Sequence, residues 1–123
     1  MTPTPDASLL EAFPTPTDNA FEIEHTSDEF TSVCPVTGHP DFGSVVLRYR
    51  PRAGSAGGVC VELKSLKMYY QSFRNAGIYY EAVTNRILDD LVAATEPRRM
   101  EVVGDFYVRG GITTQITARY EKG

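Results

Sequence analysis

Cys34 and Asp41, seven positions apart, are the residues of this chain best suited to covalent chemistry. Cys34 stands between Val33 and Pro35, just before Gly38-His39-Pro40, in a short stretch without the pattern of an apolar strand. Loops of this kind often carry reactive groups, and a cysteine thiolate is a strong nucleophile. Asp41 could take the thiol proton and later supply a proton to a substrate. The alternatives are a cysteine that packs as a small apolar side chain and an aspartate that caps a turn.

Two carboxylates and two lysines form a second group of candidate site residues. Glu62 and Glu81 could each accept two adjacent N–H donors of a ligand, because charged acceptors make the stronger hydrogen bonds. Glu81 could instead be an acidic residue that favours the first turn of a helix. Lys64 and Lys67 could bind anionic groups of a ligand, or they could be solvated lysines on a strand.

The composition indicates one folded domain and argues against several functional classes. The chain has 123 residues, of which 41% are hydrophobic and 23% charged, as in ordinary globular proteins. The net charge of -4 argues against a broad nucleic-acid surface. No apolar run reaches the roughly 18 residues of a membrane span, and the N-terminus lacks a secretory signal pattern. We therefore expect a cytoplasmic protein without direct nucleic-acid or membrane contacts.

The two cysteines and two histidines do not suggest a metal site. Cys34 and Cys60 could form a disulfide, but reduced thiols are expected in a chain without an export signal. The spacing of Cys34 with His39 or Cys60 makes a poor zinc ligand set. We assign no role to His25 or His39, and we expect Cys60 to pack inside the protein.

Hydrophobic periodicity predicts an α+β domain over residues 21–123, with two helices on one face of a four-stranded antiparallel sheet. The predicted elements are strands at 44–50 and 59–65, a helical turn at 68–73, a helix at 78–95, and strands at 100–108 and 112–120. Their order is ββααββ. The bare sheet face would carry Glu62, Lys64, Thr113, Gln115, Thr117 and Arg119. Residues 1–20 hold four prolines and are expected to form a mobile tail, or an arm whose Leu9, Leu10 and Phe13 dock on a neighbouring subunit.

Two blocks of the sequence carry a resemblance to a known family. The first runs from Phe30 to Gly43 and contains Cys34 and Asp41; the second is Val61-Glu62-Leu63-Lys64-Ser65-Leu66-Lys67, followed by Met68-Tyr69-Tyr70-Gln71-Ser72-Phe73-Arg74-Asn75. In this order they resemble the nitrile reductases that convert 7-cyano-7-deazaguanine to its aminomethyl form, in the biosynthesis of the tRNA base queuosine. The resemblance extends from about Phe30 to Arg109, whereas the tail and the last strand match loosely.

The resemblance implies roles for the candidate residues. Cys34 would attack the nitrile carbon to form a covalent thioimidate, and Asp41 would supply the proton. Glu81 would bind the donor edge of the deazaguanine, and the backbone of Val61-Glu62-Leu63 would form the other wall of the pocket. Some members of the family have a histidine where this chain has Tyr80, which could still bond to or stack on the base.

The resemblance also implies a cofactor and an assembly. Two molecules of NADPH would be used in succession, and Lys64 and Lys67 are the candidate contacts. The glycine-rich stretch 54–58 lacks the spacing of a nucleotide-binding loop and is interpreted as a hairpin turn. The family has the tunnelling fold, in which protomers join edge strands into a barrel, and two stacked pentameric rings are implied.

Two other functions remain open from the sequence. One is a zinc-dependent GTP cyclohydrolase of the same fold, which would need a better set of metal ligands than this chain offers. The other is a non-catalytic purine-binding module, against which the presence of both Cys34 and Asp41 argues.

Overall fold

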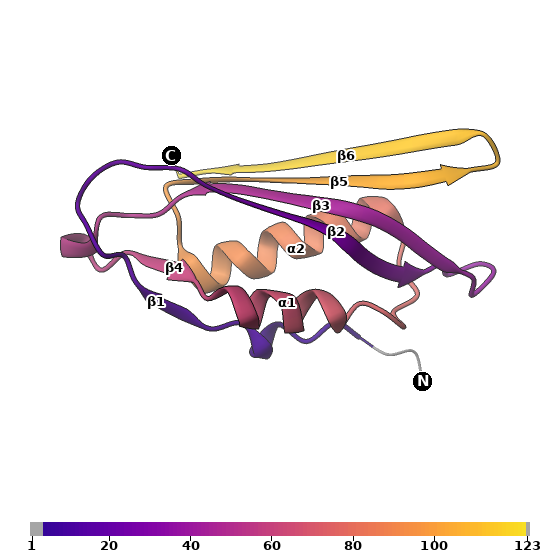
Figure 1. Cartoon of the computed structure of the whole chain (residues 1–123), viewed down its shortest axis with the longest axis horizontal. Helices are drawn as coiled ribbons and strands as arrows, with labels where there is room; N and C mark the ends of the chain where they lie inside the picture. The colour runs from indigo at the N-terminus through magenta and orange to yellow at the C-terminus, as the bar shows by residue number, and fades with distance from the viewer. Residues whose placement is uncertain (1–3, 123) are drawn as a thin grey trace.

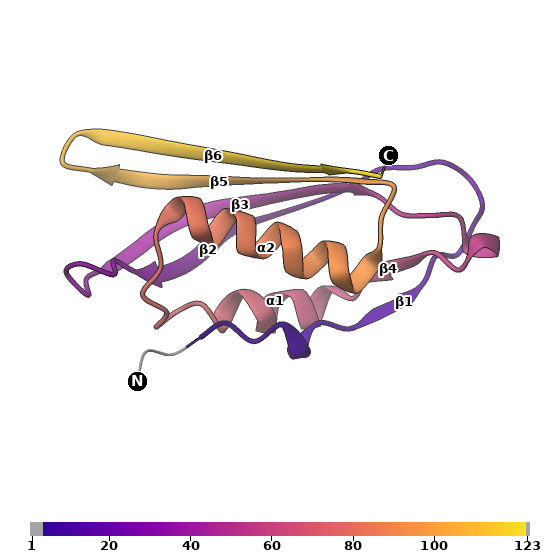
Figure 2. The ribbon, with the colours of Figure 1, turned by 180° about the vertical axis from the view of Figure 1, so that it is seen from behind.

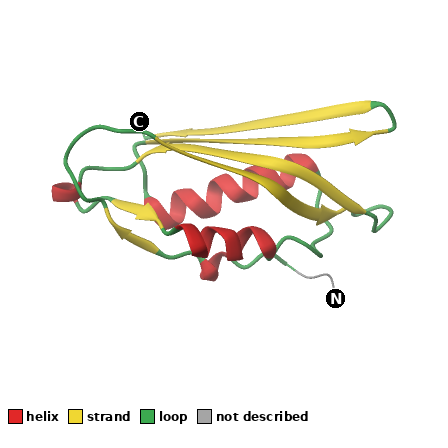
Figure 3. Cartoon of the chain, viewed as in Figure 1, coloured by secondary structure: helices red, strands yellow, loops and turns green. Residues whose placement is uncertain are grey.

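A four-stranded antiparallel sheet and two helices form the two layers of the protein, in a computed structural model that describes residues 4–122 (Figures 1 and 3). The sheet has the order β2-β3-β5-β6 and consists of β2 (Ile23–Val33), β3 (Pro40–Arg50), β5 (Arg99–Arg109) and β6 (Ile112–Glu121). The helices are α1 (Leu63–Gln71) and α2 (Tyr80–Thr95). Figure 2, seen from behind, shows both helices on the same side of the sheet.

Alternation along the strands follows the predicted pattern where one face is buried. On β3, Val45, Leu47 and Tyr49 are buried against the helices. On β6 the residues of the opposite face, Thr113, Gln115, Thr117 and Arg119, are exposed, as predicted for the bare face. This arrangement arises because successive side chains of a strand point to opposite faces of the sheet.

The prediction of a strand over 59–65 is wrong beyond Val61. Only β4 (Val59–Val61) is a strand, and it pairs with β1 (Ala12–Pro14), outside the main sheet. The chain then turns into α1 because the Glu62 carboxylate accepts the backbone N–H groups of Lys64, at 2.7 Å, and Ser65, at 2.9 Å. These bonds satisfy donors that the first turn of a helix leaves free. Glu62 and Lys64 therefore do not lie on the bare face of the sheet.

The first strand pair of the main sheet consists of β2 and β3, and β2 has no counterpart among the predicted strands. The segment is mostly polar, and the pairing register shifts between Ser27 and Phe30, so that no regular alternation marks it. Such a bulge inserts an extra residue into one strand, which breaks the two-residue alternation of inward and outward side chains. For the main sheet and its two helices the order ββααββ holds, with β2 and β3 as the first pair, while β1 and β4 are additional strands.

The long helix agrees closely with its prediction. It begins at Tyr80 and ends at Thr95, before Glu96 in a left-handed conformation and Pro97. Its inward face carries Val83, Thr84, Ile87, Leu88 and Leu91, at the spacing of an amphipathic helix. Among residues 4–122, no helix is both long and apolar enough to cross a membrane.

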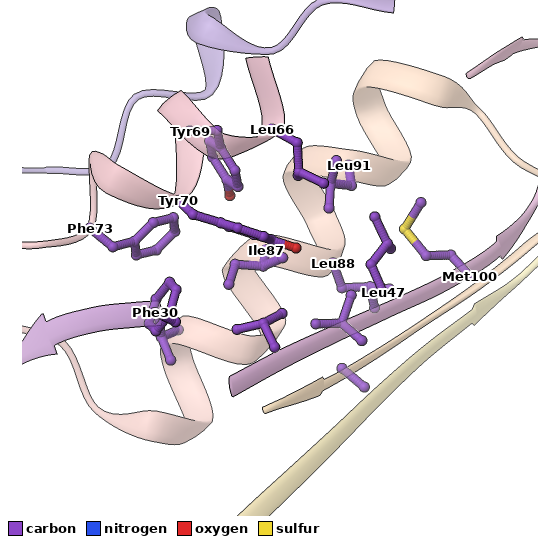
Figure 4. Packing of buried hydrophobic residues seen from close by; sticks show 14 of the residues in the cluster. Phe30, Leu47, Leu66, Tyr69, Tyr70, Phe73, Ile87, Leu88, Leu91 and Met100 are labelled. Atoms are coloured by element: carbon purple, nitrogen blue, oxygen red, sulfur yellow. The ribbon is translucent and has the colours of Figure 1, made fainter. Parts of the chain in front are cut away.

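Aromatic side chains fix α1 against β2 and α2 (Figure 4). The rings of Tyr69 and Phe73 lie edge to face at 5.2 Å, and Phe30 of β2 lies 5.4 Å from Phe73. Tyr69 also donates a hydrogen bond to Asp90 of α2 at 2.6 Å. Each buried ring of this kind stabilises the fold by about 1.5–3 kcal/mol.

The described part of the N-terminal segment lies against its own chain. From residue 4 onward it includes a short 3-10 helix, Ala7–Leu9, and β1. The carbonyl of Glu11 accepts the Glu62 N–H at 2.8 Å, and Leu10 packs at the edge of the core. Strand pairing with β4 satisfies backbone groups that a mobile tail would leave to water. Residues 1–3 lie outside the described part, and docking on a neighbouring subunit stays a prediction.

Replacing Tyr49 with phenylalanine tests the hydrogen bond that joins β3 to Val61, the last residue of β4. The Tyr49 hydroxyl accepts the N–H of Val61 at 3.0 Å, and burial raises the pKa of this phenol to about 12. Tyr49→Phe would leave the buried Val61 N–H without a partner, so the free energy of unfolding should fall by about 1–3 kcal/mol. Urea denaturation measures the change, with Tyr107→Phe, at a 57% exposed ring, as the matched control. Equal stability of the two variants would contradict the assignment.

Candidate active site

Residues from four segments meet at the end of the sheet where β2 passes into β3. Cys34 follows β2, Asp41 lies on β3, Tyr80 begins α2 and Arg109 ends β5. In Figure 1 this is the right-hand end of the molecule. The sequence places these residues far apart, and the sheet and α2 bring them together.

A tight turn presents Cys34. The Cys34 N–H donates to the carbonyl of His39 at 2.9 Å, and the Gly38 N–H donates to the carbonyl of Cys34 at 2.8 Å. Gly38 has a φ of 74°, a conformation that glycine adopts without strain. The preceding Val33 is held by Ala76, whose carbonyl accepts its N–H at 3.0 Å. The partly exposed Cys34 side chain therefore stands on a well-bonded turn.

The turn favours the thiolate form of Cys34. Hydrogen bonds from the Thr37 side chain, and then from the backbone of Thr37 and Val36, lower the pKa of the Cys34 thiol below its ordinary value. Partial burial and the charge of Asp41 act in the opposite direction. A thiol with a lowered pKa and partial exposure is a candidate nucleophile.

Asp41 is a carboxylate on the apolar face of the sheet. It is 6% exposed and shares the inward face of β3 with Val45 and Leu47. A buried charge is costly unless it is paired, and Oδ1 of Asp41 has two partners. The Tyr80 hydroxyl donates to it at 3.0 Å, and Nη2 of Arg109 lies 2.5 Å away. Extending the period of two back from Val45 would have placed Asp41 on this face.

Tyr80 has contacts at one face of its ring and at its hydroxyl group. Its ring stacks on Phe106 of β5, with centroids 3.9 Å apart and an angle of 6° between the planes. Burial raises the pKa of the Tyr80 phenol, and the hydrogen bond to Asp41 raises it further. Tyr80 was predicted to contact the substrate, but its hydroxyl is bonded to Asp41.

Arg109 also lies at this end, and no role was predicted for it from the sequence. It donates to the Pro40 carbonyl at 2.8 Å as well as pairing with Asp41. The pairing register of β5 and β6 shifts between Phe106 and Arg109. No spacing in the sequence signals its approach to Asp41, because the contact depends on the register of β5 beside β3.

Glu81 follows Tyr80 in the first turn of α2 and is exposed. Its carboxylate is therefore available to a ligand at the same end of the molecule as Cys34 and Asp41. An acidic group here is also favoured by the dipole of α2. The structure thus places Cys34, Asp41, Tyr80 and Glu81 at one end of the molecule.

The other predicted site residues lie elsewhere in the chain. Val61, Glu62 and Leu63 form the junction of β4 and α1, which Figure 1 shows away from the turn that carries Cys34. The Glu62 carboxylate caps α1, and the N–H groups of Val61 and Glu62 are bonded within the chain, to Tyr49 and Glu11. Lys64 is exposed in the first turn of α1. Within one chain, the predicted site residues at this junction therefore lie apart from Cys34 and Asp41.

A groove of about 440 Å³ runs between β2 and α1. Its lining includes Lys67, Tyr70 and Arg74 on one side and His25, Asp28 and Thr31 on the other. Burial lowers the pKa of His25, which keeps the imidazole neutral at pH 7. Lys67 and Arg74 are the cations that could hold phosphate groups here.

Two further predictions concern the thiols and metal ligands. Cys60 is buried and packs as expected, and neither cysteine forms a disulfide. Within residues 4–122, no three His, Cys, Asp or Glu side chains are grouped so that they could hold a metal ion.

Comparison with known proteins assigns the chain to a family. A sequence model described as QueF-like protein matches residues 40–123. An NADPH-dependent 7-cyano-7-deazaguanine reductase of Chloroherpeton thalassium is 55% identical over 114 residues, covering 92% of this chain and 94% of that protein. The protein of the same name from Thermomicrobium roseum is 53% identical over 121 residues, covering 98% of this chain and 91% of its own.

A solved structure is similar in fold. The crystal structure titled archaeosine synthase QueF-Like in the apo form has a TM-score of 0.71 and 22% identity, covering 89% of this chain and 98% of that chain. At this identity the likeness concerns the fold alone. It confirms the predicted α+β tunnelling fold.

Replacing Thr37 with valine tests the cause of the Cys34 reactivity. Thr37→Val removes the side-chain donor to the sulfur, so the pKa of Cys34 should rise toward the ordinary thiol value. The pH dependence of alkylation by iodoacetamide, followed by mass spectrometry, measures this change. Cys34→Ala is the control, because the remaining Cys60 is buried. An unchanged profile in Thr37→Val would contradict the proposed cause.

Proposed function

Because the chain belongs to the family of QueF-like proteins, we propose that it reduces the nitrile of 7-cyano-7-deazaguanine to an aminomethyl group, with NADPH as the reductant. This reaction serves queuosine biosynthesis and tRNA modification. The observation that best supports it is that Cys34, with a lowered thiol pKa, and the buried Asp41 lie at one end of the sheet. Relatives more than half identical over nearly the whole chain carry the name of this reductase.

Neither alternative function is favoured. The zinc-dependent cyclohydrolase would need a group of metal ligands, and no such group lies within residues 4–122. A non-catalytic purine-binding module would not need a thiol of lowered pKa beside a buried carboxylate. The reductase uses both groups.

In this proposal Cys34 forms the covalent intermediate and Asp41 moves the proton. The Cys34 proton passes to Asp41, and the thiolate adds to the nitrile carbon. The nitrogen takes the proton back from Asp41, which completes a neutral thioimidate without net gain or loss of atoms. A soft thiolate suits this step because a nitrile is a weak electrophile. Arg109, paired with Asp41, stabilises the carboxylate while it is charged.

The conversion of the nitrile to a primary amine takes four electrons, and two molecules of NADPH each supply one hydride. The groove between β2 and α1 could hold a phosphorylated cofactor through Lys67 and Arg74, on the side opposite Asp28 and Glu29. Lys64, one turn earlier on α1, would contact the same ligand from outside the groove. Lys64 and Lys67 thus remain the proposed cofactor contacts, now as residues of a helix.

Glu81 is the proposed anchor of the substrate. Its exposed carboxylate can accept the ring N–H and the amino group on one edge of a deazaguanine. The backbone of Val61-Glu62-Leu63 would form the opposite wall, contributed by a second copy of the chain. Glu62 is the weaker anchor, because its side chain already caps α1.

A homo-oligomer would unite the two groups of residues. Within the described chain, β2 and β6 each pair on one side only, and free strand edges are normally covered. Joining these edges between copies would close a barrel, and we propose two stacked pentamers in the cytoplasm.

Cofactor oxidation tests the reaction directly. Purified protein mixed with 7-cyano-7-deazaguanine should oxidise two NADPH per nitrile, followed by the absorbance of the reduced nicotinamide. Cys34→Ala should abolish this oxidation, and Asp41→Asn should slow it at least about 100-fold, as expected for loss of an acid–base group. A folded, oligomeric wild-type protein that oxidises no NADPH would contradict the proposed function.

Mixing two inactive variants tests whether the site is shared between copies. Cys34→Ala retains an intact α1, and the double variant Lys64→Ala/Lys67→Ala retains Cys34. If α1 of one copy serves Cys34 of another, joint refolding should restore nitrile-dependent oxidation at the interfaces that combine the intact parts. Each variant refolded alone is the control. Absence of recovery in mixed oligomers, verified with two affinity tags, would place the whole site in one chain.

A further inference from the structure

Tyr80 is bonded to the carboxylate that is proposed to move the proton. We infer that Tyr80 is a positioning residue, which holds Asp41 in one orientation for proton transfer and does not contact the deazaguanine. The inference rests on the proposed function and deepens it. It replaces the substrate-binding role that was predicted for Tyr80.

The two oxygens of Asp41 have different surroundings. Both neighbouring donors, the Tyr80 hydroxyl at 3.0 Å and Nη2 of Arg109 at 2.5 Å, lie on Oδ1. Oδ1 is therefore occupied, and Oδ2 is the oxygen that can exchange a proton. With two donors on one oxygen, rotation of the carboxyl group about its bond would break both contacts. The orientation of Oδ2 is thus set before a substrate arrives.

The Tyr80 ring is itself fixed. It stacks on Phe106, which is 2% exposed, and the Tyr80 carbonyl accepts a hydrogen bond from Thr84 at 3.0 Å. Gly104 permits this close approach of α2 to β5, because a Cβ atom there would lie 2.6 Å from Oγ1 of Thr84. A ring held between a helix and a strand is poorly placed to turn toward a ligand.

The protonation state of Tyr80 allows it to donate a hydrogen bond. Burial raises the pKa of the phenol, so it keeps its proton at neutral pH and can donate to Asp41. The charged and titratable groups facing Asp41 are Tyr80 from α2, Arg109 from β5 and Cys34 from the turn after β2. The phenol and the guanidinium both lie against Oδ1, and the proposed step needs the carboxylate to accept the thiol proton.

These contacts assign the route of one proton. It leaves the Cys34 sulfur for Oδ2 of Asp41 as the thiolate adds to the nitrile carbon, and Oδ2 then delivers it to the nitrile nitrogen. Tyr80 keeps its own proton throughout. Loss of the phenol should therefore impair this transfer and leave noncovalent binding of the substrate unchanged.

Tyr80→Phe tests the inference, because it removes only the hydroxyl and keeps a ring to stack on Phe106. Tyr79→Phe, at a neighbouring 59% exposed ring, is the matched control. In otherwise wild-type protein without NADPH, the rate of thioimidate formation from 7-cyano-7-deazaguanine is measured against pH. In a Cys34→Ala background, where no adduct forms, calorimetry measures the dissociation constant of the same compound.

Tyr80→Phe should slow thioimidate formation about tenfold at each pH, as expected for loss of one hydrogen bond to a charged group. The dissociation constant in the Cys34→Ala background should stay within about twofold, since a lost hydrogen bond to the ligand would cost more.

Weaker binding of the substrate with an unchanged rate of thioimidate formation would overturn the inference and make Tyr80 a substrate contact. A rate and profile equal to those of Tyr79→Phe would also overturn it. If wild-type protein forms no adduct, the proposed function fails and the inference fails with it. Adduct formation by the wild type separates these two cases.

Discussion

The active end of this protein depends on one buried carboxylate. Asp41 lies on the face of β3 that packs against the helices, where an unpaired charge would be strongly destabilising. Arg109 and Tyr80 supply its partners, and they come from the end of β5 and the start of α2. Three elements of the fold are thus joined at the residue that is proposed to move the proton. The same contacts that make the charge tolerable orient it for chemistry.

Local hydrogen bonds at the junction of β4 and α1 determine where the remaining candidate residues lie. The Glu62 carboxylate begins α1 and so carries Lys64 and Lys67 onto a helix beside β2. Because Cys34 stands at the turn after β2, the proposed cofactor and substrate walls do not meet it within one chain. The proposal of a site shared between copies rests on this separation, and such an assembly would cover the free strand edges at β2 and β6.

The sequence predicts the parts of the fold in which one physical pattern dominates. Alternation identified the buried face of β3, and helical spacing located α2 to within two residues at its start. It failed for β2, where polar residues and the irregularity between Ser27 and Phe30 hide the strand. It also failed at Glu62, because alternation cannot reveal a helix cap. The motif made Cys34 and Asp41 candidate site residues, whereas the approach of Arg109 to Asp41 depends on the register of β5 beside β3.

The most direct test is to locate the covalent intermediate. Protein incubated with 7-cyano-7-deazaguanine in the absence of NADPH is analysed by mass spectrometry, first intact and then after digestion. We expect the mass of each chain to increase by the mass of one substrate molecule, and we expect the added mass on the peptide that contains Cys34. An adduct on Cys60, or no adduct on folded protein, would contradict the assignment of Cys34 as the nucleophile.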